Sequence, residues 1–378
     1  VRSRGLGDVY KRQVQDLRKQ LLYLVKFEVM ILNPKFPLYL PGVENSNNDN
    51  VSIIGASLRE DVTILGYFVS GNGGLEIKIQ NTYSTKEYAS FNDILRKFIQ
   101  DNQLENVQRL GMAVPGPVID GKSSPARLGW SLDVEEFKRD FGFEKVDMLN
   151  DMEASAYGMA LLEDSDLEAI YTSGHLEKGN VAILAPGNGL GEAGYFFDGK
   201  NLRPFATEGG HSEFSPRTNV EVEFYQFLNN IYGIVSWENV LSKTGLFNIY
   251  RFLRDVKRHP EPEWLGERLA NGNFAQELYK AAVEDNVLIC KIALDTFLEF
   301  LAREANNLTL KLKATGGLLI AGDIPQMVIE YVDKTKFYEK FKISDKMESM
   351  LRNIPIYLVK QNHTALKGMA LYTAYYQE

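Results

Sequence analysis

The chain is poor in cysteine, in positive charge and in long apolar runs. Cys290 is its only cysteine, so the sequence offers neither an internal disulfide framework nor a cysteine-rich zinc site. We therefore expect a protein of the reducing cytoplasm. Lys and Arg number 42 against 50 Asp and Glu, which gives a net charge of −8. That balance argues against a nucleic-acid partner, because proteins that bind nucleic acids usually present a basic face.

The first residues do not fit a folded domain. The run DVYKRQ at residues 8–13 reads like the translation of a sequencing adapter, so we expect residues 1–29 to be a non-native extension and Met30 the true start. The alternative is a signal peptide built on the apolar run at residues 21–25. Lys26 and Glu28 interrupt that run and no small-residue cleavage site follows. The run is also too short to span a bilayer, so we expect no membrane partner.

The remaining sequence is long enough for two domains of ordinary size, and its 44% apolar content is typical of a globular protein. It contains no short tandem repeat and no low-complexity tract. Periodicity predicts strands, then alternating helices and strands, and the pattern recurs after residue 179. The predicted strands are residues 51–56, 62–69, 75–83, 107–114, 181–185, 193–197, 317–322 and 354–359. The predicted helices include residues 91–101, 220–232, 248–256, 274–312, 336–343 and 365–376.

The most informative segment is residues 146–158, where a short apolar run ends in Asn150 and Asp151 and passes directly into helix-forming residues. Ligands of open α/β sheets bind outside such strand ends, and a carboxylate there can accept a proton from a substrate hydroxyl. Asn and Asp are also favoured helix caps, so the pair alone leaves both interpretations open.

Two later segments add to the first. A predicted strand runs into the glycine-rich turn Gly187-Asn188-Gly189-Leu190-Gly191, and the polar loop Glu208-Gly209-Gly210-His211 follows. Glycines allow several backbone N–H groups to point at one anion, although they also simply make turns. In this order and spacing, the three segments resemble the bacterial glucokinase family of the hexokinase and actin-like superfamily of sugar kinases.

The resemblance extends from about residue 38 to the C-terminus and is specific from Gly111 onward. It implies an α/β chain with a two-lobed actin-like ATPase (ribonuclease H-like) fold and a central cleft. Residues 48–162 together with 364–378 would form the small domain, and residues 163–363 the large domain. A homodimer is the family's tendency.

The resemblance also implies roles for the polar residues. Asp151 would take the proton of the sugar's 6-hydroxyl as that oxygen attacks the γ-phosphate of ATP. Asn150, Glu208 and His211 would bind sugar hydroxyls, and so would Glu238, unless its carboxylate is simply a solvated charge on a helix. Taken alone, a loop like residues 208–211 would favour a structural role. Because the loop occurs together with the other two segments, we favour sugar binding.

The same resemblance implies which residues bind the nucleotide. Gly322 would adjoin the adenosine, and Asp323, which replaces a second glycine common in the family, would line that turn or cap the next helix. ATP would act with Mg²⁺, and no metal ligand is assigned to the protein. The residues implied in phosphate binding are Gly187, Asn188 (usually Thr in the family), Gly189 and Gly191.

Two departures from the family pattern stand out. The family opens with Asp-x-Gly-Gly-Thr, which contacts phosphate, whereas residues 56–61 read ASLRED here. Ser57 then stands at the Asp position, and Arg59 and Glu60 replace the glycines. In the sugar loop, Arg127 stands where the family often has Asn, so we count Arg127 among the sugar-binding residues.

These observations predict an ATP-dependent glucokinase that forms glucose 6-phosphate from glucose. Two alternatives remain open. The altered segment at residues 56–61 is compatible with a catalytically degenerate sugar-binding protein of the same fold, and Arg127 is compatible with a kinase of another hexose.

Overall fold

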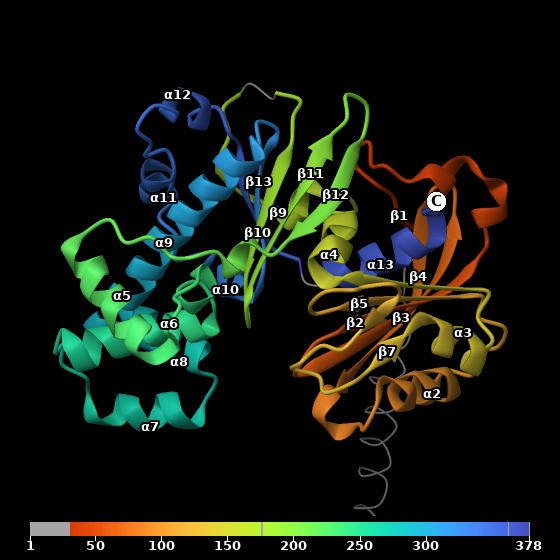
Figure 1. Ribbon diagram of the computed structural model, residues 1–378, viewed down its shortest axis with the longest axis horizontal. Coiled ribbons are helices and arrows are strands. Elements are labelled where there is room, and N and C mark those ends of the chain that lie inside the picture. Colours follow the sequence, from red (N-terminus) through yellow and green to blue (C-terminus); the bar gives the residue numbers. More distant parts are fainter. Residues whose placement is uncertain (1–30, 175–176, 362, 378) are drawn as a thin grey trace, which may run out of the picture.

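The computed structural model describes residues 31–174, 177–361 and 363–377. The expected extension at residues 1–29 and the proposed start at Met30 lie outside these ranges. Within them the chain is a mixed α/β protein with two six-stranded sheets, each covered by helices (Figure 1). Over the same ranges, none of the helices combines the length and the apolar character needed to cross a bilayer.

The first sheet combines an antiparallel meander with parallel strands. In spatial order its strands are β1 (Ile31–Leu32), β4 (Gly74–Ser84), β3 (Val62–Gly71), β2 (Ser52–Leu58), β5 (Arg109–Val114) and β8 (Lys145–Asn150). β3 pairs antiparallel with β2 and β4, whereas β5 runs parallel to both β2 and β8. The carboxyl ends of β2, β5 and β8 therefore lie at one edge, where ligands of α/β sheets bind.

Both faces of this sheet are buried. Ile53 and Ile54 on β2 point to opposite faces, and neither side chain is exposed to solvent. Ile54 packs in a core with α2 (Phe91–Asp101) and α3 (Val134–Phe141), and Ile53 packs in a second core with α4 (Asp151–Met159) and α13 (Thr364–Tyr375). Burial on both faces explains why β2 is a nearly continuous apolar run rather than an alternating one.

The second sheet has three parallel strands at its centre. In spatial order its strands are β12 (Leu202–Thr207), β11 (Leu190–Phe197), β10 (Val181–Pro186), β13 (Gly317–Ile320), β14 (Ile356–Val359) and β9 (Leu167–Tyr171). β10, β13 and β14 are parallel, and β10 pairs antiparallel with β11 across the glycine-rich turn, as predicted. That turn therefore lies at the carboxyl end of β10, next to the end of β13.

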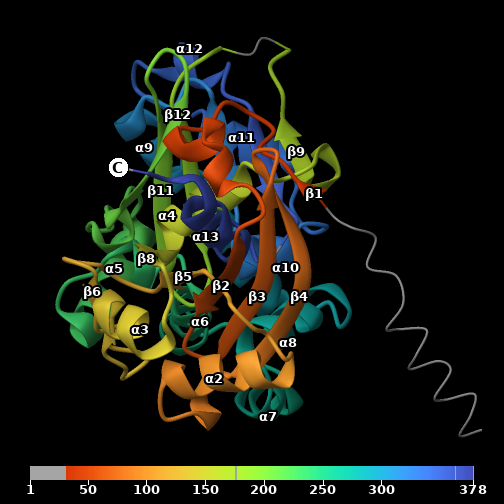
Figure 2. The same cartoon turned by 90° about the vertical axis from the view of Figure 1, so that its right-hand side faces the viewer.

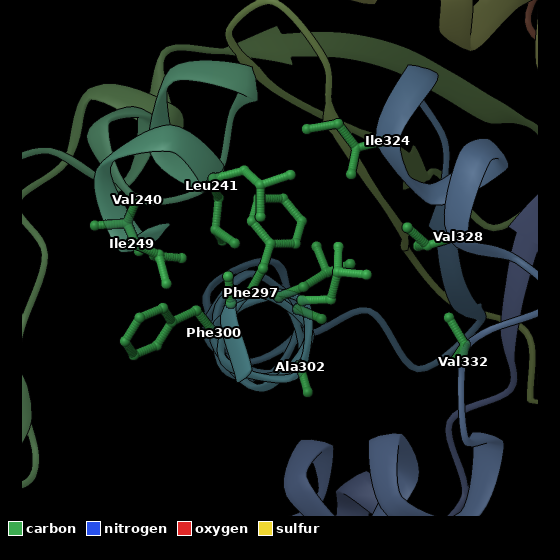
Figure 3. Close-up of a cluster of buried hydrophobic side chains, with 14 of the residues drawn as sticks. Val240, Leu241, Ile249, Phe297, Phe300, Ala302, Ile324, Val328 and Val332 are labelled. Atoms are coloured by element: carbon green, nitrogen blue, oxygen red, sulfur yellow. The ribbon is translucent and has the colours of Figure 1, made fainter. Parts of the chain in front are cut away.

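A large helical core packs on the second sheet. Its centre is the long helix α9, whose Phe297 and Phe300 lie against Val240, Leu241 and other apolar side chains (Figure 3). The helices in this part of the chain are α5 (Asn219–Tyr232), α6 (Lys243–Arg251), α7 (Glu263–Asn271), α8 (Phe274–Val283), α9 (Leu288–Leu312), α10 (Asp323–Val328), α11 (Lys334–Phe341) and α12 (Glu348–Leu351).

Residues 274–312 are mostly long helix, as predicted, but they form two helices. α8 ends at Val283 and α9 begins at Leu288, and Asn286 between them has a positive φ of 60°. A right-handed helix does not continue through such a residue, and Asn is among the few side chains that tolerate it. The apolar periodicity persists across the break because both helices face the same core.

α4 and α13 cross at a pair of glycines between the two sheets (Figures 1 and 2). A Cβ atom on Gly158 would lie 1.9 Å from the carbonyl oxygen of Thr364, and one on Gly368 would lie 1.8 Å from that of Ala154. Only glycine permits this approach. The C-terminal helix thus packs on the first sheet, although the whole second sheet separates the two in sequence.

Candidate active site

The junction of β8 and α4 holds the two residues that the sequence singles out most strongly. Asn150 caps α4, because its Oδ1 accepts hydrogen bonds from the N–H groups of Met152 at 2.9 Å and Glu153 at 3.4 Å. Its Nδ2 donates to the carbonyl oxygen of Gly116 at 3.1 Å. The helix-cap interpretation is therefore confirmed for Asn150. The cap also fixes the first turn of α4, and with it the position of Asp151.

Asp151 has the electrostatic environment of a proton acceptor. Burial raises the pKa of Asp151 to about 6, although the N–H of Met152 and the charge of Arg59 act to lower it and the charge of Glu208 raises it. General bases work best when their pKa lies near the operating pH. The two charges that act on Asp151 belong to residues that follow β2 and β12.

The loop after β12 presents the next two predicted residues to solvent. Glu208 and His211 are exposed at the two ends of a short 3-10 turn, and the N–H of His211 donates to the Glu208 carbonyl oxygen at 3.0 Å. The glycines between them are required sterically. A Cβ on Gly209 would lie 2.0 Å from Oε2 of Glu192, and one on Gly210 would lie 2.3 Å from the carbonyl oxygen of Leu190.

A buried carboxyl pair, which the sequence did not reveal, lies beneath this loop. Glu192 on β11 is 1% exposed and Glu304 on α9 is fully buried, and the two side chains are close enough that the charge of Glu304 acts on Glu192. Burial raises the pKa of Glu192 to about 8, with the charge of Glu304 adding to the rise. Two buried carboxyl groups so near each other cannot both ionise easily, so Glu192 keeps its proton at a pH where an exposed carboxyl group would have lost it.

Two other predicted residues pair across the two halves of the chain. Nη2 of Arg127 lies 3.2 Å from Oε1 of Glu238, while Oε2 of Glu238 accepts the N–H of Leu190 at 3.1 Å. A Cβ on Gly189 would lie 2.4 Å from the same Oε2. The structure thus brings the carboxylate of Glu238 against the glycine-rich turn, with Arg127 beside it.

The glycine-rich turn packs tightly on its neighbours. The N–H of Gly187 donates to the carbonyl oxygen of Gly189 at 2.8 Å, and the Gly187 carbonyl accepts the N–H of Lys243 at 2.8 Å. A Cβ on Gly191 would lie 2.3 Å from Sδ of Met152 on α4. The turn therefore lies beside the helix that carries Asp151.

Gly322 brings the end of β13 against the end of β10. It has a positive φ of 97°, and a Cβ there would lie 2.4 Å from the carbonyl oxygen of Pro186. Beyond it opens a cavity of about 420 Å³, within the size range of pockets for small organic ligands. Its lining residues are Lys243, Asn273, Ala275, Gln276, Asp323, Ile324, Gln326 and Met327.

Four residues from separate elements converge beside this cavity, and we call them the Arg59 cluster: Arg59, Asn188, Lys243 and Asp323. Nη2 of Arg59 and Nζ of Lys243 lie 3.0 Å and 3.1 Å from the same Oδ2 of Asp323. Nζ of Lys243 also donates to Oδ1 of Asn188 at 2.7 Å. Burial acts to raise the pKa of Asp323, but the charges of Arg59 and Lys243 outweigh it and lower that pKa.

The structure brings most of the predicted residues near one another, with Ser57 as the exception, and it adds Lys243 to them. Ser57 is buried within β2 at 5% exposure, so Arg59 rather than Ser57 is the first residue of that hairpin to reach the cluster. Lys243 was missed, because a lysine at the start of a helix carries no distinguishing local signal. Over the described ranges, no group of three or more His, Cys, Asp or Glu side chains gathers as a metal site.

Comparisons with known proteins agree on one family. A model of the glucokinase family matches residues 62–376. The glucokinase of Nostoc punctiforme is 28% identical over 318 residues, which cover 81% of this chain and 93% of that protein. The glucokinase of Saccharophagus degradans is 31% identical over 284 residues, which cover 75% of this chain and 86% of that protein.

Solved structures show the same fold. A glucokinase from an Antarctic psychrotroph matches with a TM-score of 0.72 at 23% identity, over 85% of this chain and 98% of that one. A Balamuthia mandrillaris glucokinase in complex with glucose matches with a TM-score of 0.68 at 19% identity, over 86% and 93%. Because the family match spans most of the sequence, the predicted resemblance is confirmed: the chain belongs to the glucokinase family.

Proposed function

We propose that the protein transfers the γ-phosphoryl group of ATP to the 6-hydroxyl of glucose, with Asp151 as the general base. The observation that carries this proposal is the position of Asp151 at the carboxyl end of β8, with a pKa of about 6. In the reaction the sugar oxygen forms a bond to phosphorus, the bond to the bridging oxygen of ADP breaks, and the hydroxyl proton passes to Asp151.

Sugar binding is assigned to the polar residues around Asp151. Asn150, Glu208 and His211 present an amide, a carboxylate and an imidazole, which together can donate to and accept from vicinal hydroxyls. Glu238 and Arg127 would complete the pocket on the side of the glycine-rich turn. A site that pairs every sugar hydroxyl rejects analogues that lack one, because its own polar groups are then left unpaired.

Nucleotide binding is assigned to the cavity beyond Gly322 and to the glycine-rich turn. The cavity beyond Gly322 would hold the adenosine, and the turn formed by Gly187, Asn188, Gly189 and Gly191 would direct backbone N–H groups at the phosphates. Ser57 stays a predicted phosphate contact. An AMPPNP and glucose complex is described for a ROK family glucokinase of Streptomyces griseus, which has a TM-score of 0.57 to this chain at 15% identity over 84% of it and 98% of that chain.

Mg²⁺ would enter with the nucleotide. The ion usually keeps several waters and is bound through substrate phosphates with few protein carboxylates. Asp151 is the carboxylate near the reacting groups that could hold it through water. When bound, Mg²⁺ neutralises charge on the phosphates.

We further propose that two lobes close around a central cleft during catalysis. Residues 48–162 with 364–378 would form the small lobe on the first sheet, and residues 163–363 the large lobe on the second. The packing of α13 on the first sheet supports this division. Closure would expel water, which otherwise competes with the sugar hydroxyl for the phosphoryl group.

The test is formation of glucose 6-phosphate from glucose and Mg-ATP by protein started at Met30, measured beside Asp151→Ala and Asp151→Asn. We expect turnover in the wild type and a loss of about 10²–10⁴-fold in both variants, with glucose binding retained in calorimetry. Turnover within about tenfold of wild type would eliminate Asp151 as the base. Glucose binding without turnover in the wild type would favour the degenerate sugar-binding alternative.

A further inference from the structure

The Arg59 cluster has more positive than negative charge. Arg59 and Lys243 both contact the single oxygen Oδ2 of Asp323, and Asn188 is neutral. Two cations on one carboxylate oxygen leave an excess of one positive charge where four separate elements meet. The side chains are partly exposed, with 37% of Arg59 and 30% of Lys243 open to solvent. Ion pairs this exposed contribute little to folding stability, so a structural role alone does not account for the convergence.

The cluster borders the cavity assigned to the nucleotide and contacts the predicted phosphate turn. Lys243 and Asp323 line the cavity beyond Gly322. On the other side, the charge of Arg59 acts on Asp151. The backbone of Lys243 is tied to Gly187 in the predicted phosphate turn. A nucleotide held in the cavity with its phosphates at this turn would therefore bring those phosphates near Arg59 and Lys243.

We propose that Arg59 and Lys243 are phosphate ligands of the transfer reaction, and that Asp323 is a resident counter-charge which the triphosphate displaces. This inference rests on the function proposed above. Arg59 donates hydrogen bonds to the phosphoryl group as it moves from ADP to the sugar oxygen, and Lys243 holds the phosphates that remain on the nucleotide. No proton leaves either side chain, since the 6-hydroxyl proton goes to Asp151.

The proposal explains how the altered hairpin at residues 56–61 can serve a kinase. The family's glycine pair lets backbone approach phosphate, whereas this chain places a guanidinium there. Guanidinium groups bind phosphate through paired, charge-assisted hydrogen bonds, and an arginine that contacts the transferred group raises phosphoryl-transfer rates by about 10³–10⁵-fold in other enzymes. In this proposal the guanidinium of Arg59 binds the phosphate that backbone N–H groups of the glycine pair contact in the family.

The experiment compares Arg59→Ala, Arg59→Lys, Lys243→Ala and Asp323→Asn in the full chain, with glucose and ATP binding measured by calorimetry and turnover by the coupled assay. We expect Arg59→Ala to lower kcat at least about 10³-fold while glucose binding stays within about twofold. Arg59→Lys should recover part of that loss, and Lys243→Ala should weaken ATP binding more than it changes kcat.

Asp323→Asn separates the proposal from a purely structural ion pair. If Asp323 only pairs with the two cations until ATP binds, the Asp323→Asn variant should bind ATP several-fold more tightly than the wild type does. If the ion pair is structural, Asp323→Asn and Arg59→Ala should lose activity and thermal stability together, which would overturn the proposal. Arg352→Ala, which removes the exposed Arg352–Glu348 pair of α12, is the matched control. Wild-type turnover with an unaffected Arg59→Ala would refute this inference alone, whereas absent wild-type turnover would refute the proposed function.

Discussion

Arg127 and Glu238 are joined by an ion pair of 3.2 Å, although they are 111 residues apart in sequence. The second oxygen of Glu238 accepts the backbone N–H of Leu190 in the glycine-rich turn. The pair therefore links the loop before α3 to the phosphate turn and sets the orientation of a predicted sugar-binding carboxylate. Arg127, one of the departures from the family pattern, thus has a specific partner.

Replacing Arg127 by Ala should raise the KM for glucose by about tenfold, because a hydrogen bond involving a charged group contributes about 1.5–3 kcal/mol. The KM for ATP should stay unchanged. Steady-state kinetics with each substrate varied in turn measures both. Arg139→Ala, which removes an exposed ion pair of α3, is the control. An equal rise in both KM values would point to a general disturbance instead.

The activity should depend on pH through Asp151. Its carboxylate must be ionised to accept the sugar proton, so kcat/KM for glucose should rise with pH and level off above the pKa of about 6. Glu208→Gln removes a charge that raises this pKa, so the acidic limb of the profile should move to lower pH, whatever happens to its height. A profile of kcat/KM from pH 5 to pH 8 measures this shift. If the acidic limb of the Glu208→Gln profile does not move, the assignment of Asp151 as the titrating base is contradicted.

The buried pair of Glu192 and Glu304 should make stability depend on pH in the opposite sense to an ordinary carboxylate. The pKa of Glu192 is about 8 in the folded protein against 4.5 ordinarily, so the folded state retains a proton that the unfolded state loses. The contribution of this group to stability is complete below about pH 4.5 and is lost as pH rises through about 8.

Glu192→Gln should remove that dependence while keeping the shape of the side chain. The melting temperature of the wild type should fall more steeply than that of the variant between pH 5 and pH 9. Thermal unfolding followed by circular dichroism at each pH compares the two slopes. Equal slopes would contradict the raised pKa of Glu192 in the folded state.

Gly158→Ala should destabilise the protein, because the added Cβ would lie 1.9 Å from the backbone oxygen of Thr364. Overpacking against backbone typically costs about 1–3 kcal/mol, and here neither helix can move without separating α4 from α13. The free energy of unfolding in urea measures the loss. Gly71→Ala is the matched control, since a Cβ at that position has no atom within 4 Å.

Much of the fold follows from local sequence. The helix predicted at residues 91–101 is observed at those bounds, and the strands predicted at residues 62–69 and 75–83 are observed two residues or fewer from their predicted ends. These elements can be predicted from the sequence because apolar periodicity and helix caps depend on residues that are neighbours in the chain. The residue type and place of Asn150 before α4 left a helix cap open as one of two interpretations, and the structure contains that cap.

Tertiary structure decided which charges meet. Arg59 pairs with Asp323 across 264 residues, and Glu192 contacts Glu304 from a different element. No local pattern distinguishes these side chains from charges that simply face water, because a charged residue is stable in solvent at almost any surface position. The sequence by itself determined most strands of the two sheets, the glycine turns and the position of Asp151 at a strand end, but not β9 and β12. Only the packing of the two sheets, through α4 and α13, determined which cations and carboxylates lie beside that residue.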